Sequence, residues 1–259
     1  MITVIMGNIS SGKTHLIKEK MSKATLPIIY WSPQTDLFPI DAIYLKSEFP
    51  HLSILANGEE NKLRHLSNHH DIYIEVPWYL EIKSIDSFLK QLNCHRLALI
   101  SKVEQKQDWQ MWTDEIILNE EINGKNDLVL PNSLDLQIYR ATLTGEVLDF
   151  SSLETFWLEL IHGAYGEVIR IKGIFTILDG QWIYGEFLSG KYPKDFCPLN
   201  FPLNLEGRPQ QFSGLEIVGR NLDKQAIADT LGEFCLSDEA IFYYQQQVKQ
   251  SLVLEKEKV

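Results

Sequence analysis

Apolar residues in the first half of the chain form short continuous runs separated by stretches with helical spacing. Runs of strand length cover residues 2–6, 27–31, 71–76, 97–100 and 115–118. Such runs are typical of parallel strands that are buried on both faces. Between two of them, a helical stripe follows Ser84, which we take as its N-cap; its members are Ile85, Phe88, Leu89 and Leu92. The alternation predicts an α/β fold with a parallel sheet flanked by helices.

After about residue 130 the pattern favours strands with aromatic residues and longer helices. Ser151 and Glu154 form a capping box at the start of an amphipathic helix that ends near Gly163. Residues 168–177 and 182–188 flank a turn, which predicts a β-hairpin. A proline-rich loop over 190–213, a strand over 215–218 and a helix over 224–234 follow. A terminal helix carries the stripe Ile241, Tyr244, Val248 and Leu252.

Composition limits the classes of function. A chain of 259 residues favours two domains over one. No apolar run is long enough to span a bilayer and no signal-peptide pattern is present, so we expect a cytoplasmic protein without membrane partners. The net charge of -11 argues against nucleic-acid binding. The three cysteines lie far apart, so they indicate neither a disulfide framework nor a paired thiolate site.

Residues 7–14 read Gly-Asn-Ile-Ser-Ser-Gly-Lys-Thr and stand between a predicted strand and a predicted helix. This is the Walker A pattern, in which backbone amides surround a phosphate at a helix N-terminus. Lys13 would reach the β and γ phosphate oxygens, and Thr14 would bind Mg²⁺. The plain alternative is a glycine-containing turn that joins a strand to a helix. We predict nucleotide binding by Gly7, Asn8, Ser10, Ser11, Gly12, Lys13, Thr14 and the adjacent His15.

The sequence resembles the CobW-like family of P-loop GTPases, the cobalamin-synthesis and metal-chaperone group. The stretch "VIMGNISSGKTHLI" is similar to the family's N-terminus, and two later stretches resemble its C-terminal domain: "EVIRIKGIFTILDGQWIYGEF" and "FSGLEIVGRNLDKQAIADTLGEF". The resemblance implies a shortened P-loop domain over 1–130 and a smaller α+β domain over 131–259. It also implies GTP with Mg²⁺, a link to metal homeostasis, and a client protein contacted through the second domain.

Three family motifs are altered in this chain. Where the family carries Asn-Gly and then Cys-x-Cys-Cys, this chain continues from Asn57-Gly58 into Glu59-Glu60. The missing thiolates argue against tight zinc or cobalt binding. Glu75 matches the family glutamate on the magnesium and water side, and we expect it to be catalytic and to help hold Mg²⁺. Trp78 replaces that motif's glycine, which a phosphate-contacting loop would favour.

The guanine-reading motif is also degraded. Asn119 takes the place of the family asparagine, while Glu120 and Ile122 replace the lysine and the aspartate. Losing the charged acceptor costs about 1.5 to 3 kcal/mol, so guanine preference is weakened and ATP is the alternative nucleotide. A rival placement of the motif would use Ser101, Lys102 and Glu104.

His65, His69 and His70 form the main histidine cluster, and His65 with His69 would share one face of a helix. Without a third ligand at a defined spacing, surface histidines are the better account. His15 would contact the α-phosphate or face solvent.

The sequence therefore predicts a slow P-loop nucleoside triphosphatase. The alternatives are a degenerate relative that binds nucleotide without hydrolysis or serves only as an interaction module, and an ATP-using P-loop protein.

Overall fold

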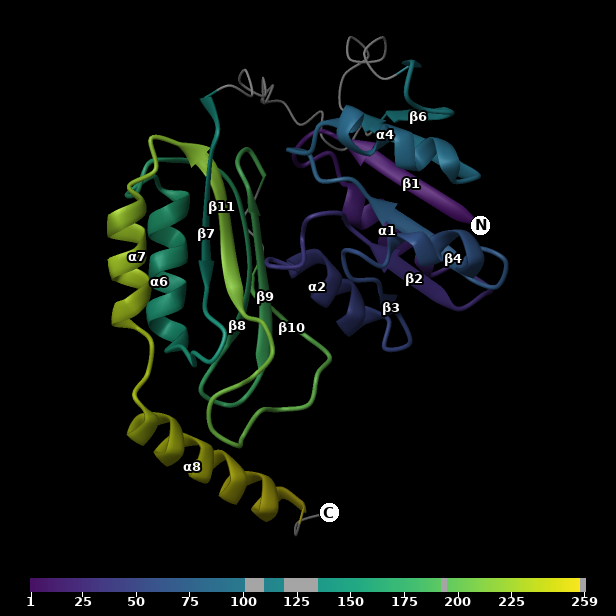
Figure 1. Ribbon diagram of the computed structural model, residues 1–259. Coiled ribbons are helices and arrows are strands. Elements are labelled where there is room, and N and C mark those ends of the chain that lie inside the picture. Colours follow the sequence, from purple (N-terminus) through teal and green to yellow (C-terminus); the bar gives the residue numbers. More distant parts are fainter. Residues whose placement is uncertain (101–109, 119–134, 192–194, 257–259) are drawn as a thin grey trace. The chain divides into compact units, whose positions relative to one another are not determined.

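The computed structural model describes residues 1–100, 110–118, 135–191 and 195–256 (Figure 1). The chain divides into two compact units, Met1–Asp127 and Leu128–Val259. Each unit contains its own sheet and its own core of buried side chains.

The first unit has a six-stranded sheet in which every strand pair is parallel. The strand order is β3-β2-β4-β1-β5-β6, so β4 lies between β2 and β1. Strand pairs in register bring Ile5 of β1 opposite Glu75 of β4. The strands are β1 (Ile2–Gly7), β2 (Ile28–Trp31), β3 (Ser53–Ile54), β4 (Asp71–Glu75), β5 (Cys94–Ile100) and β6 (Glu115–Leu118).

Helices cover both faces of this sheet, as expected for parallel strands with continuous apolar runs. On one face, Ile5 of β1 packs with Ile17 of α1 (Lys13–Met21) and Leu45 of α2 (Ile40–Glu48). On the other, Val4 of β1 packs with Leu89 of α4 (Ile82–Gln91) and with Leu63. Leu63 begins α3 (Leu63–Leu66), which follows the 3₁₀ turn η1 (Glu60–Lys62). The predicted α/β fold is confirmed.

The second unit is built on a five-stranded antiparallel sheet with the order β10-β9-β8-β11-β7. Its strands are β7 (Gln137–Thr142), β8 (Glu167–Thr176), β9 (Trp182–Leu188), β10 (Cys197–Pro198) and β11 (Gly214–Arg220). Two helices, α6 (Phe150–Ile161) and α7 (Lys224–Glu233), lie side by side on one face (Figure 1). Phe156 and Trp157 of α6 pack there with Ile171 of β8 and Ile217 of β11.

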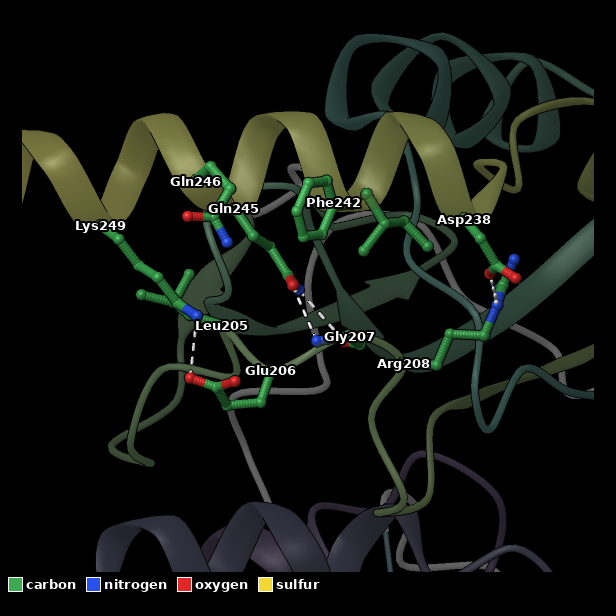
Figure 2. Close-up of a pocket in the computed structure, with 10 residues that line it drawn as sticks. Leu205, Glu206, Gly207, Arg208, Asp238, Phe242, Gln245, Gln246 and Lys249 are labelled. Carbon is green, nitrogen blue, oxygen red and sulfur yellow. Dashed lines mark hydrogen bonds and ion pairs between the residues drawn. The ribbon is translucent and has the colours of Figure 1, made fainter.

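The last helix, α8 (Asp238–Lys256), is fastened to the loop that precedes β11. The Gln245 side chain is 3% exposed; its oxygen accepts from the Gly207 amide at 2.8 Å, and its nitrogen donates to the Asn204 and Gly207 carbonyl oxygens. Figure 2 shows Gln245 pointing from α8 toward Gly207, with ion pairs Lys249–Glu206 and Arg208–Asp238 on either side. Helix and loop line a pocket of about 440 Å³ that belongs to the second unit.

The structure corrects three details of the predicted helices. Helix α4 begins at Ile82, and the Ser84 hydroxyl donates to the Glu81 carbonyl oxygen at 2.6 Å, so Ser84 lies in the first turn and is not the N-cap. The N-cap of α6 is Asp149, whose carboxylate accepts from the Ser152 amide, so the predicted capping box of Ser151 and Glu154 is wrong.

In α8, Tyr244 is 42% exposed and Gln245 takes its place on the buried stripe. The spacing between Ile241 and Val248 allows either Tyr244 or Gln245 to be the buried residue between them. Gln245 is buried because its side-chain amide forms hydrogen bonds with the loop.

The predicted hairpin of β8 and β9 is confirmed. The strands β3, β7 and β10 were not predicted, and β10 lies inside the stretch that we expected to be a loop. In the described ranges, none of the helices has the length and apolar character needed to cross a membrane.

Candidate functional site

The loop after β1 has an unusual backbone. Gly7, Ser10 and Gly12 have positive φ angles of 155°, 58° and 91°. A Cβ atom on Gly7 would lie only 2.4 Å from the Leu99 carbonyl oxygen and 2.5 Å from Ser11 Oγ, so the position accepts only glycine. Ser10 adopts the left-handed region, which is uncommon outside glycine and clusters at functional sites. Successive residues of alternating handedness turn backbone N–H groups toward one side, which makes an anion-binding concavity.

Lys13 is the first residue of α1 and extends back over the loop. Its Nζ atom donates to the Gly7 and Asn8 carbonyl oxygens at 3.0 Å each, and the residue is only 7% exposed. Burial of an ammonium group is costly unless anions or hydrogen-bond acceptors surround it. A phosphate would offer negatively charged acceptors in place of neutral carbonyls, so this position favours an anion.

Thr14 and Glu75 connect the loop to β4. The Thr14 hydroxyl lies 3.1 Å from Oε1 and 3.2 Å from Oε2 of Glu75, and it donates to that carboxylate. Glu75 is 6% exposed and is the last residue of β4, next to β1 in the sheet. Because parallel strands end at the same edge, the topology brings the carboxylate beneath the first turn of α1.

Two residues from β2 and its end also contact Glu75. The Tyr30 hydroxyl donates to Oε2 of Glu75 at 3.0 Å, and the Ser32 hydroxyl donates to the Glu75 carbonyl oxygen at 2.9 Å. Tyr30 is 1% exposed. Burial, followed by the negative charge of Glu75, raises the pKa of the Tyr30 hydroxyl well above its usual value. The hydroxyl therefore keeps its proton, and remains a donor, throughout the neutral range.

The structure brings most of the predicted site residues together. Gly7 ends β1, and Asn8, Ser10, Ser11 and Gly12 lie in the loop between β1 and α1, while Lys13, Thr14 and His15 form the first turn of α1. Ser10 Oγ is buried and has no hydrogen-bond partner within the described part of the chain. The His15 side chain is exposed on α1.

Several predicted positions fall outside the described residues. Asn119, Glu120 and Ile122 of the expected guanine-reading motif are among them. Ser101, Lys102 and Glu104 of the rival placement are also among them.

The residues at the altered motifs make local contacts, although the Trp78 indole nitrogen is buried without a hydrogen-bond partner among the described residues. Trp78 is half-buried and packs edge-on against Tyr79. Asn57 accepts from the Gln34 amide at 3.1 Å, and Glu59 forms an ion pair with Lys62. Helix α3 ends at Leu66, so the expectation that His65 and His69 share a helix face is wrong.

Among the described residues, no three His, Cys, Asp or Glu side chains are grouped so that they could hold a metal ion. Thr14 and Glu75 nevertheless place a hydroxyl oxygen and a carboxylate side by side at the start of α1. Magnesium takes oxygen ligands and is commonly held by one or two protein groups together with substrate phosphates. The residues present therefore fit Mg²⁺ bound with a nucleotide.

Sequence reasoning missed Tyr30 and Ser32. Their spacing of two places both side chains on the same side of an extended chain, and they stand at the end of a predicted strand. That signal was present in the sequence. Their relevance depends on β2 pairing with β4, and strand order cannot be read from local periodicity.

No family model matches the sequence, and a search of curated proteins finds no match. Two solved structures are similar over 91% of this chain and 98% of theirs: zinc-bound YjiA GTPase from E. coli, with 12% identity and a TM-score of 0.32, and a zinc-bound triple mutant of YjiA GTPase, with 13% identity and a TM-score of 0.34. Both scores are low, so the fold is assigned from the strand order and loop geometry described above.

Proposed function

We propose that the first unit binds a nucleoside triphosphate with Mg²⁺ in the loop Gly7–Thr14 and hydrolyses it slowly. The observation that carries this proposal is the convergence of Lys13, Thr14 and Glu75 at one end of the parallel sheet, behind a loop with three positive φ angles. A plain connecting turn needs neither a buried ammonium group nor a buried carboxylate at its end.

Each residue has a defined task in this proposal. The loop amides and the N-terminus of α1 bind phosphate oxygens, since the first amides of a helix lack partners within it. Lys13 exchanges its carbonyl partners for phosphate oxygens. Thr14 and Glu75 would hold Mg²⁺, Glu75 through a water, and the metal would supply neutralisation of phosphate charge. Glu75 also orients the attacking water by accepting a hydrogen bond from it.

GTP is the first candidate nucleotide because of the resemblance to CobW-like GTPases, and ATP is the alternative. A link to metal homeostasis and a client protein bound through the second unit rest on that resemblance alone. We place the division between the two domains near residue 130, with the cytoplasm as the site of action.

Binding without hydrolysis is the second candidate function. The half-buried indole of Trp78 favours it, because the residue stands three positions after Glu75 where a glycine would let the backbone approach a γ-phosphate. Single-turnover measurement of phosphate release distinguishes the two candidates. Release above the protein-free rate, reduced in Glu75→Ala, supports the hydrolase, and release at the protein-free rate supports the binding module.

The proposal is tested by calorimetry with GTP, ATP and their diphosphates in the presence of Mg²⁺. We expect binding that Lys13→Ala weakens roughly ten- to a hundredfold, because a charged hydrogen-bond donor to phosphate is lost. Lys20→Ala, in the last turn of the same helix, is the matched control and should bind like the wild type. Equal affinity in Lys13→Ala and Lys20→Ala would exclude the loop as the binding site.

A further inference from the structure

The contacts around Glu75 indicate a role for Tyr30, a residue outside the Walker A motif of residues 7–14. The carboxylate contacts hydroxyl groups from two separate elements: Thr14 from α1, and Tyr30 from the neighbouring strand β2. Thr14 is also the residue that would bind the metal. When its hydroxyl oxygen turns toward Mg²⁺, the position of the carboxylate depends more heavily on its other contacts.

We propose that Tyr30 is a positioning residue of the magnesium–nucleotide site: its hydroxyl holds the Glu75 carboxylate beneath Thr14 so that both oxygen groups are in place when Mg²⁺ arrives with the nucleotide. This inference rests on the proposed function.

The geometry gives Tyr30 an independent hold on the carboxylate. Its register partner on β4 is Tyr73, two residues before Glu75, and the Tyr30 hydroxyl reaches Oε2 of Glu75 at 3.0 Å. The ring itself is fixed in the core formed by Ile5, Ile17 and Leu45. A rigid buried ring with a terminal donor defines the position of a carboxylate more closely than a flexible side chain does.

Ser32 completes the contact of this segment with Glu75. Its hydroxyl donates to the Glu75 carbonyl oxygen at 2.9 Å, and Ser32 is 8% exposed. One end of β2 therefore fixes both the main chain and the side chain of Glu75. The main-chain contact sets where β4 ends, and the side-chain contact sets the direction of the carboxylate.

A purely structural role is the competing explanation, since buried hydroxyl groups generally need a hydrogen-bond partner. The two explanations differ in what Tyr30→Phe should change. A structural role predicts a change in thermal stability alone. A positioning role predicts a change in the Mg²⁺ dependence of nucleotide binding, while binding in the absence of Mg²⁺ stays the same because Lys13 and the loop amides are unaffected.

The experiment measures the affinity for GTP, and for ATP in parallel, over a series of Mg²⁺ concentrations and in EDTA. We expect Tyr30→Phe to raise the Mg²⁺ concentration for half-maximal enhancement roughly tenfold, as for the loss of a hydrogen bond to a charged group, with affinity in EDTA unchanged. Tyr73→Phe is the matched control, because Tyr73 is the register partner of Tyr30 on the adjacent strand and packs in the same core, and the variant makes the same replacement there. Its Mg²⁺ dependence should equal that of the wild type.

Ser32→Ala is measured alongside, because it removes the second contact with Glu75 without disturbing the buried ring. It should shift the Mg²⁺ requirement in the same direction by a smaller factor. Circular dichroism and thermal unfolding identify the folded variants. The inference is overturned if the wild type shows Mg²⁺-dependent binding and folded Tyr30→Phe shifts the requirement no further than Tyr73→Phe does. If Tyr30→Phe does not fold, Ser32→Ala takes its place in this comparison. If the wild type binds neither nucleotide, the proposed function itself fails.

Discussion

Among single residues, most of the buried polar and charged side chains of the first unit lie at one end of its sheet. Lys13, Glu75 and Ser32 are each less than a tenth exposed, although charged and polar residues are rarely buried without a specific reason. Buried groups of this kind cost stability unless their partners are well placed. Their concentration beside a strained loop is therefore better explained by binding than by stability.

The reactivity of Cys197 and Cys235 tests how buried each thiol is in the second unit. Burial, followed by the charge of Glu146, raises the pKa of the Cys235 thiol to about 11. Since the thiolate is the reactive form, Cys235 should label slowly at pH 8 and about tenfold faster with each unit of added pH until that value. The exposed Cys197 should label first. Mass spectrometry after iodoacetamide treatment follows each cysteine separately.

Unfolding in guanidinium is the control for this labelling, because all three cysteines should then react alike. Equal rates for Cys197 and Cys235 in the folded protein would show that the Cys235 thiol is more accessible than the structure indicates.

Site residues could be predicted when they are contiguous in the sequence. They could not be predicted when their proximity depends on the order of strands in the sheet. Positions 7–14 form one contiguous motif, so the sequence showed the loop, the lysine and the threonine together. Glu75 was found through its family resemblance. Tyr30 comes within 3.0 Å of Glu75 only because β2 lies beside β4, although 45 residues separate them in the chain.

At the scale of elements, the attachment of α8 depends on one buried amide. Gln245→Leu keeps a side chain of similar volume but removes the partner of the Gly207 amide and an amide donor to Asn204. A fully buried group left without its partner costs about 1–3 kcal/mol, and these two groups are part-buried. We therefore expect the free energy of unfolding of the second unit to fall by about 2–4 kcal/mol, the lower part of their sum. Denaturant titration measures this change, and hydrogen exchange should show that α8 loses protection first.

Gln247→Leu is the matched control for this element, since it makes the same replacement at an exposed position of α8. It should change stability by less than about 0.5 kcal/mol. If the two leucine variants have the same free energy of unfolding, the hydrogen bonds of the Gln245 amide do not contribute to stability beyond what an apolar contact provides.

Helix α8 shows why the location of a helix in the sequence was easier to predict than which of its residues are buried. Apolar spacing located α8, but it assigned the buried stripe to Tyr244, because hydrophobicity alone does not register the carbonyl and amide groups of residues 204–207. The short strands β3 and β10 contain two residues each and are too brief to produce a periodic signal. Contacts with distant parts of the chain, and not local sequence preference, determine both the buried side of α8 and the two short strands.

At the scale of the whole molecule, the two units contain separate hydrophobic cores. The cores of the first unit draw on residues 2–94, whereas the core of the second draws on residues 139–235. A ligand that binds only the folded state stabilises it by about 2.7 kcal/mol at a concentration of one hundred times its dissociation constant. For a unit of this size, that energy corresponds to an increase in melting temperature of roughly 10 °C.

We therefore expect Mg²⁺ with the triphosphate to raise the melting temperature of the first unit by about this amount and to leave the second unit unchanged. Scanning calorimetry measures the transitions, and hydrogen exchange during heating assigns each to its unit. At the same nucleotide concentration, Lys13→Ala should keep both transitions but show about half of this shift or less, because its affinity is ten- to a hundredfold weaker. An equal increase in both units would mean that the cores unfold as one cooperative structure, and an increase confined to the second unit would move the nucleotide site out of the loop Gly7–Thr14. The pattern of shifts thus reports where the nucleotide binds without relying on hydrolysis.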